Sequence, residues 1–379
     1  MRDILSAWES IGHGVVDQNT KDREKYWKHW TSYCTAFDKH PHLHNCSAGE
    51  QMVIITAFAA RVRTGFYGHG RQVTVQTVKL ALSSISKTIE LAGQRSPIYK
   101  ADEAYKVPVA RLVEGMRRDD PPPVPQIAVP ISVPEKVLKT GQDSKNPIIK
   151  AIGDLTLIAF YYLLRVGEYT KPKFTTVNGQ QVRATRTVQF ALKNVGFFQK
   201  GHIVPRASPL SELLEADSCT LKISNQKNGR MGQTIHHHAT GKPHSCPVQA
   251  LARRVHHVLS NNGTSDNLIC DVWKPNTNSW YQITPTDMIT SIRKAVVELK
   301  LHQQGIDPDM VGVHSLRAGG AMALKLTGES DTTIMKLGRW RSLTFLEYVH
   351  NQIAHLSIDL SKKMSTHLEF NNIAAIEQD

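Results

Sequence analysis

A proline-rich segment after the first third of the chain sets the strongest limit on the fold. The residues DDPPPVPQIAVPISVP run from Asp119 to Pro134. Proline lacks a backbone N–H and is excluded from helix interiors, so this segment predicts a semi-rigid extended linker. We therefore expect a helical domain over residues 1–119, a linker over 120–134 and a second domain over 135–379. A chain of 379 residues is long enough for two hydrophobic cores.

The first domain is predicted to consist of helices. In KDREKYWKHWTSYCTAF the apolar residues from Tyr26 to Phe37 recur at helical spacing, which favours core packing over base stacking for these rings. Further helices are expected from Glu50 to Arg63, from Thr74 onward, and from about Tyr105 to Arg118.

The second domain is predicted to be mainly helical around a small three-stranded sheet. An apolar helix is expected over residues 147–165, with strands over 187–195, 220–224 and 233–237. The polar stretch NQKNGRMG between the last two strands is typical of a hairpin turn. Thr284 and Asp331 are expected to cap later helices, and NQIAHLSIDLSKKM (351–364) predicts a helix near the end.

The charge of the chain points to a polyanionic partner. The formal net charge is +13 and the calculated pI is about 9.5. The basic surplus is spread over both halves of the sequence, as expected if both contact one long polyanion, either nucleic acid or an anionic membrane surface. A merely basic soluble protein is the plain alternative.

Other sequence features argue against a secreted or membrane-spanning protein. The five cysteines are scattered without CxxC pairs, which favours a reducing compartment and no disulfide framework. The first residues do not have the pattern of a signal peptide. The longest strongly apolar stretch, Leu155 to Leu164, is too short to span a bilayer and ends at Arg165.

Four segments carry reactive or phosphate-binding side chains in a fixed order. They are YYLLRVGEYT, SNQKNGRMGQ, GVHSLRAGG and LGRWRSLTFLEYVHNQ, and each alone is a weak signal. Together they resemble the motifs of the tyrosine recombinases (the phage-integrase family), and in particular the recombinases of eukaryotic Crypton and DIRS mobile elements. The segments RLVEGMRRDDPPP and CPVQALARR are also similar to stretches of such enzymes. The matching residues are Arg165, Glu168, Lys227, His314, Arg317, Gly338, Arg339, Trp340 and Tyr348.

The residue types fit metal-independent cleavage of a phosphodiester. Tyr348 would attack the phosphorus and form a covalent 3′-phosphotyrosyl bond, which conserves the bond energy, so that religation needs no ATP. Arg165 and Arg317 would each direct two donors to the non-bridging oxygens. His314 stands three residues before Arg317, on one helical face, and would donate a hydrogen bond or act as acid or base. The sequence has no carboxylate cluster of the kind that holds Mg²⁺, and no cofactor is expected.

Three further residues have supporting or alternative assignments. Lys227, at the hairpin tip, would protonate the departing 5′ oxygen, with Lys222 and Arg230 left as alternatives. Trp340 would donate its indole N–H to a phosphate oxygen, and Glu168 would orient Arg165 or its neighbours. Trp340 precedes the tyrosine by eight residues, whereas bacterial and phage members of the family have nine.

Two histidine-rich stretches have plainer interpretations. His236, His237 and His238 are interpreted as surface residues or DNA-backbone contacts rather than metal ligands. A structural zinc ion at His42, His44 and Cys46 is disfavoured, because no second Cys/His pair follows at zinc-finger spacing.

The resemblance implies a SAM-like core-binding domain and a recombinase catalytic domain that form a clamp around double-stranded DNA. It also implies a dimer on each site, a tetramer in the synapse, and the nucleus as location if the source is a eukaryotic element, otherwise the cytoplasm or nucleoid. No membrane or small-molecule partner is expected. The alternatives are a type IB topoisomerase-like activity, a domesticated DNA-binding protein without catalysis, and a structural nuclear protein with chance matches. The sequence leaves open the target DNA and whether the element integrates, excises or inverts.

Overall fold

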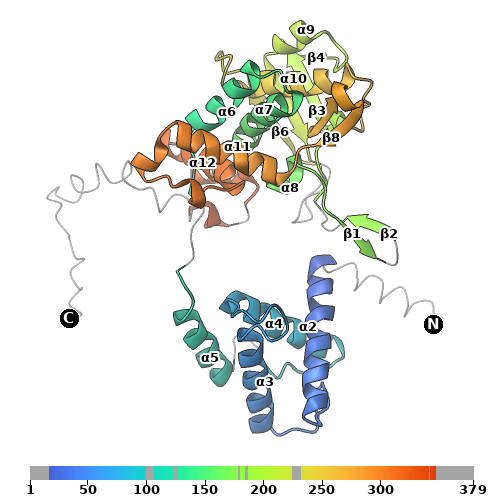
Figure 1. Cartoon of the computed structure of the whole chain (residues 1–379), viewed down its shortest axis with the longest axis vertical. Coiled ribbons are helices and arrows are strands. Elements are labelled where there is room, and N and C mark those ends of the chain that lie inside the picture. Colours follow the sequence, from blue (N-terminus) through green and yellow to red (C-terminus); the bar gives the residue numbers. More distant parts are fainter. Residues whose placement is uncertain are drawn as a thin grey trace, which may run out of the picture. The chain divides into compact units, whose positions relative to one another are not determined.

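The computed structural model describes residues 17–99, 106–122, 127–177, 180–183, 187–223, 232–340 and 342–346. The chain divides into two compact units (Figure 1). Unit 1 comprises Met1–Pro123 and Phe174–Arg186, and unit 2 comprises Val124–Lys173 and Thr187–Asp379. The short hairpin β1–β2 (Phe174–Val177, Gln180–Arg183) thus groups with unit 1, although it falls in the range expected for the second domain. The assignment of residues 1–119 to a DNA-binding domain and of residues 135–379 to a catalytic domain stays a prediction.

Unit 1 contains the helices that the apolar spacing predicts. Trp30 and Phe58 are fully buried and pack edge to face at 5.1 Å between ring centroids, so these aromatic rings form core. Helix α3 begins with a capping box in which Ser47 and Glu50 satisfy each other's backbone N–H groups. The helices of this unit are α2 (Asp17–Ala36), α3 (Ala48–Arg63), α4 (Val75–Leu91) and α5 (Val107–Arg118).

The proline-rich segment is anchored at both of its ends. Asp120 forms an ion pair with Arg63 and accepts a hydrogen bond from the backbone N–H of Val75 at 2.8 Å, within unit 1. In unit 2 the backbone N–H of Val129 donates to Ser315 at 3.3 Å. Helix α6 (Ser132–Asp143) begins inside the range 120–134, because proline is tolerated in a first helical turn. The last residues of the predicted linker therefore belong to α6.

Unit 2 is built around the buried helix α7 (Pro147–Tyr161), whose residues 151–160 are all buried. This helix ends before Arg165, the end that the sequence predicts, because Leu163 adopts a left-handed conformation with φ of 47°. The other helices are α8 (Val166–Tyr169), α9 (Leu210–Leu214), α10 (Pro247–Leu259), α11 (Pro285–Glu298), α12 (His314–Leu326) and α13 (Asp331–Gly338).

The main sheet of unit 2 has four strands in the order β4-β3-β5-β6, one more than predicted. The expected strand over 187–195 is wrong, since β3 begins at Val195 after a short 3₁₀ turn (Leu192–Asn194). Lys200 and Gly201 both have positive φ and form the tight turn to the unexpected β4. The hairpin β5–β6 is confirmed, with Lys222 opposite Thr234. The strands are β3 (Val195–Gln199), β4 (His202–Val204), β5 (Ser218–Lys222) and β6 (Thr234–His238).

Several elements complete or correct the prediction. A second hairpin, β7–β8 (Asp271–Lys274, Ser279–Gln282), lies in a region expected to be helical. Thr284 caps α11 as predicted, whereas α13 is capped by Ser330 rather than Asp331. Residues 351–364 lie outside the described residues. The remaining 3₁₀ turns are Pro275–Thr277, Leu301–Gln304, Pro308–Met310 and Leu343–Phe345.

The mainly helical fold with a small antiparallel sheet agrees with the predicted fold class. Within the described ranges, none of the helices combines the length and apolarity that a bilayer crossing needs.

Candidate active site

The turn between α7 and α8 supplies two of the predicted residues. Arg165 is the N-cap residue of α8, and Glu168 stands three positions later in its first turn. The Glu168 carboxylate accepts a hydrogen bond from the Arg165 backbone N–H at 2.8 Å and from its Nη1 at 3.3 Å. The side chain of Glu168 is 2% exposed and that of Arg165 is 20% exposed. Glu168 is therefore buried, whereas the Arg165 side chain is partly exposed.

Helix α12 brings Arg317 to the same turn. Arg317 is buried, and it donates from Nη1 to the carbonyl of Leu163 and from Nη2 to the carbonyl of Gly338. The two glycines that follow permit this approach: a Cβ at Gly319 would meet the Val129 carbonyl oxygen at 2.1 Å, and one at Gly320 would meet the Phe160 carbonyl oxygen at 2.3 Å. The sequence RAGG thus packs α12 tightly against the end of α7.

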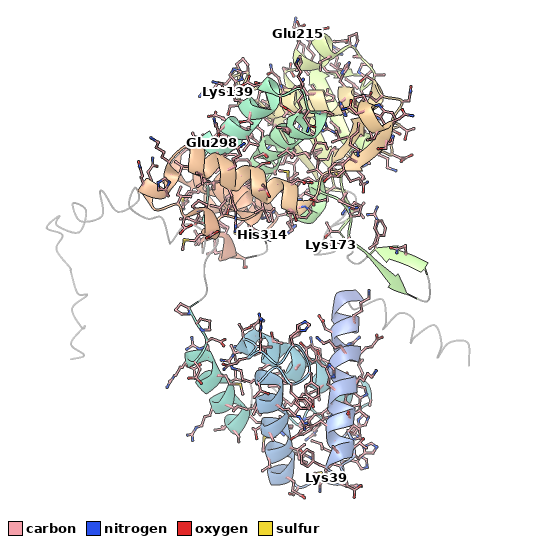
Figure 2. All side chains as sticks on the ribbon, viewed as in Figure 1. Lys39, Lys139, Lys173, Glu215, Glu298 and His314 are labelled. Carbon is pink, nitrogen blue, oxygen red and sulfur yellow. The ribbon has the colours of Figure 1, made fainter. Side chains whose placement is uncertain are left out.

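His314 is the first residue of α12 and is exposed at the surface of unit 2 (Figure 2). It stands one helical turn before the buried Arg317. The predicted pair therefore shares one helix, with the arginine inside and the imidazole at the surface.

The segment Gly338–Trp340 contacts both Arg317 and Glu168. Arg317 Cζ lies 4.1 Å from the centroid of the Trp340 ring, within the range of a cation–π contact. Arg339 adopts a left-handed conformation with φ of 60°, which ends α13 and turns its side chain into the interior. Its Nη1 and Nη2 each lie 3.1 Å from a different Glu168 oxygen, and Nη2 also donates to the Leu163 carbonyl at 2.9 Å.

The cluster holds three arginines and one carboxylate, so it carries a surplus of positive charge. The side chain of Arg339 is fully buried, and burial lowers its pKa while the Glu168 charge opposes that shift. An arginine keeps its charge in proteins even so. A surplus of guanidinium charge at a partly exposed site is suited to binding an anion with tetrahedral oxygens.

The structure thus brings together Arg165, Glu168, Arg317 and Trp340. Lys227 and Tyr348 lie outside the described residues, and Lys222 is the exposed last residue of β5. Arg339, to which the sequence prediction gave no role, is the central partner of Glu168. Its place between Gly338 and Trp340 in the motif was the only signal available.

The histidine-rich stretches do not form a metal centre in the described part of the chain, where no group of three or more His, Cys, Asp or Glu side chains could hold a metal ion. His237 packs edge to face on Tyr162 at 4.5 Å between ring centroids, and burial lowers its pKa to about 4. It is half-buried, whereas its neighbours His236 and His238 are exposed.

No protein-family model matches the chain, and no curated protein sequence is significantly similar to it. Three similar solved structures are DNA-processing proteins by name. The Tn1549 transposon integrase in complex with circular intermediate DNA is 14% identical, with 78% of this chain and 80% of that chain covered and a TM-score of 0.41. The XerH site-specific recombinase bound to difH is 15% identical, with 83% and 72% covered and a TM-score of 0.46. The XerA recombinase is 13% identical, with 95% and 97% covered and a TM-score of 0.37.

Proposed function

We propose that this chain is a tyrosine recombinase that cleaves and rejoins DNA strands through a covalent 3′-phosphotyrosyl bond to Tyr348. The observation that carries the proposal is the convergence of Arg165 and Arg317 on one turn. They come from distant parts of the sequence, and both bind within the segment Leu163–Glu168. Trp340, eight residues before the tyrosine, contacts Arg317 and so belongs to the same site.

In the proposed reaction the arginines stabilise the transition state. As the tyrosine oxygen attacks, negative charge grows on the non-bridging oxygens of the phosphate, and preorganised guanidinium donors lower the energy of that state. Arg165, whose side chain is partly exposed, contacts the phosphate directly. Arg317 is buried and donates from Nη1 and Nη2 to backbone carbonyls, so in this proposal it contributes positive charge rather than the two phosphate hydrogen bonds expected from the sequence. The Trp340 indole N–H donates to a phosphate oxygen.

Proton transfer falls to two residues in this proposal. His314 lies at the surface end of the helix that carries Arg317 and donates to the phosphate or moves the tyrosine proton. Lys227 protonates the departing 5′ oxygen. Glu168 is too deeply buried to touch DNA and orients the arginines.

Double-stranded DNA is the proposed substrate, since the net charge of +13 suits a polyanion. By resemblance of the motifs, the finer proposal is a mobile-element recombinase of the Crypton type that acts in the nucleus. It would bind as a dimer on each site and as a tetramer in the synapse.

A covalent-trapping assay tests the function. Wild type and Tyr348→Phe are incubated with nicked duplex DNA from beside the gene in the presence of EDTA, and adducts are resolved on a denaturing gel. The proposal expects a protease-sensitive protein–DNA adduct with the wild type alone. The nicks prevent religation by releasing the 5′ end, so the intermediate accumulates.

Random-sequence duplexes control for a missing recognition site. Tight binding of DNA by both proteins without an adduct on any duplex would instead favour a DNA-binding protein without catalysis. An adduct that needs a divalent metal ion would contradict the arginine mechanism.

A further inference from the structure

Glu168 is a buried carboxylate whose oxygens are contacted by two arginines of the described site. Arg165 Nη1 lies 3.3 Å from Oε1, whereas Arg339 lies 3.1 Å from both Oε1 and Oε2. The Arg339 contact uses two donors on two acceptors, which is the strongest geometry for an arginine–carboxylate pair. Arg339 thus satisfies most of the carboxylate, and Arg165 retains a single longer side-chain contact.

We propose that Arg339 is a positioning residue that occupies the Glu168 carboxylate and thereby keeps the Arg165 guanidinium available for the scissile phosphate. The inference rests on the proposed function, because it assigns the phosphate to Arg165. Arg339 itself is 1% exposed and does not reach the surface, so it acts through Glu168 and not on DNA.

Arg339 and Arg165 differ in the contacts that hold their guanidinium groups. The Arg339 side chain is held by the Leu163 carbonyl as well as by both Glu168 oxygens. Among the described residues, the Arg165 guanidinium contacts Glu168 but no backbone carbonyl, and 20% of the Arg165 side chain is exposed. Arg165 is therefore the less constrained and the more exposed of the two arginines that contact Glu168.

Loss of the Arg339 charge would redirect Arg165. A carboxylate that is 2% exposed is strongly disfavoured without a cation partner. Arg165 is already in contact with Oε1, so it is the nearest replacement. A bidentate Arg165–Glu168 pair would draw the guanidinium inward and cancel its charge, which removes it from the phosphate.

The test compares wild type with Arg339→Met, Glu168→Gln and the double variant. Met fills similar volume without charge, and Gln can still accept the hydrogen bond from the Arg165 backbone N–H. The first readout is the rate of covalent adduct formation on nicked DNA, measured beside DNA affinity. The second is modification of Arg165 by phenylglyoxal in the free protein, followed by peptide mass spectrometry, with the exposed Arg118 as internal control.

Arg339→Met is expected to slow adduct formation by about 100-fold, the size of effect seen when one transition-state donor is lost, with little change in DNA affinity. Its Arg165 should be protected from phenylglyoxal. The double variant should form adduct at least about tenfold faster than Arg339→Met, and its Arg165 should again react with phenylglyoxal. The reason is that a neutral residue 168 no longer attracts the guanidinium.

Equal rates for Arg339→Met and wild type would overturn the inference, as would a double variant no better than Arg339→Met in both readouts. If Arg339→Met does not fold, Arg339→Gln replaces it, since glutamine also lacks the charge but can still donate a hydrogen bond to the carboxylate. Wild-type behaviour of that variant would equally overturn the inference. If the wild type forms no adduct on any DNA, the proposed function fails. The phenylglyoxal pattern then still decides whether Arg339 controls Arg165.

Discussion

Replacing Gly338 by alanine tests the packing that holds Trp340 over Arg317. A Cβ at this position would stand 1.6 Å from Cζ3 of Trp340 and 2.0 Å from Cε3. Carbon atoms in contact need about 3.5 Å or more, so the indole has to retreat by about 2 Å. Overpacking of this kind costs about 1–3 kcal/mol, and loss of the cation–π contact adds about 1 kcal/mol. The expected destabilisation of unit 2 is therefore about 2–4 kcal/mol.

Calorimetric unfolding of Gly338→Ala, Trp340→Ala and their combination measures this cost. In the Trp340→Ala background the clash is absent, so alanine at 338 should change the unfolding free energy by less than about 0.5 kcal/mol. Gly115→Ala is the matched control, because a Cβ there meets nothing within 4 Å and should stabilise α5 by about 0.5–1 kcal/mol. An equal cost of Gly338→Ala with and without the indole would refute the packing argument.

Three other predictions concern the general acid, the pH dependence of stability and the salt dependence of DNA binding. Lys227→Ala should cleave ordinary DNA about 100-fold or more slowly than the wild type but cleave a 5′-bridging phosphorothiolate normally, because a thiolate leaves without a proton. Lys222→Ala should cleave both substrates normally. The opposite pattern would assign the general acid to Lys222. The pKa of His237 is lowered to about 4 in the folded protein, below its unfolded value, so the stability that neutral His237 contributes is lost as the pH falls from about 6.5 toward 4. Urea titrations should show that His237→Phe weakens this pH dependence of the unfolding free energy. The exposed-site control His236→Gln should leave it unchanged. DNA affinity should fall steeply with salt, with a log–log slope of magnitude about 5 or more, and a slope near zero would contradict phosphate-dominated binding.

Much of unit 1 and the outline of the site were predictable because they depend on local signals. Apolar spacing located α2 and α4, and a threonine–proline start located α11. The order of the motifs indicated that Arg165 and Arg317 belong together, and the structure places both at one turn.

The missed features depend on tertiary contacts or on unusual backbone conformations. The strands of the hairpin β7–β8 are only four residues long, too short for an alternating pattern to show, although their Val, Trp and Tyr residues favour strands. Their cross-strand pair of Trp273 and Trp280 forms only when the two strands meet. Arg339 has a left-handed backbone conformation, which favours glycine or asparagine, so the sequence did not indicate that α13 ends at an arginine. Its residue type also did not indicate that its side chain is buried. The role of Gly319 and Gly320 becomes visible only when α12 meets α7.

In the proposed reaction Tyr348 becomes covalently bonded to DNA, so the residue linked to the DNA can be identified chemically. Adduct formed by the wild type on nicked duplex would be digested with nuclease and protease and analysed by tandem mass spectrometry. We expect a 3′-linked nucleotide on the phenolic oxygen of Tyr348. A nucleotide on any other residue, or tight DNA binding with no linked peptide on any duplex, would contradict it.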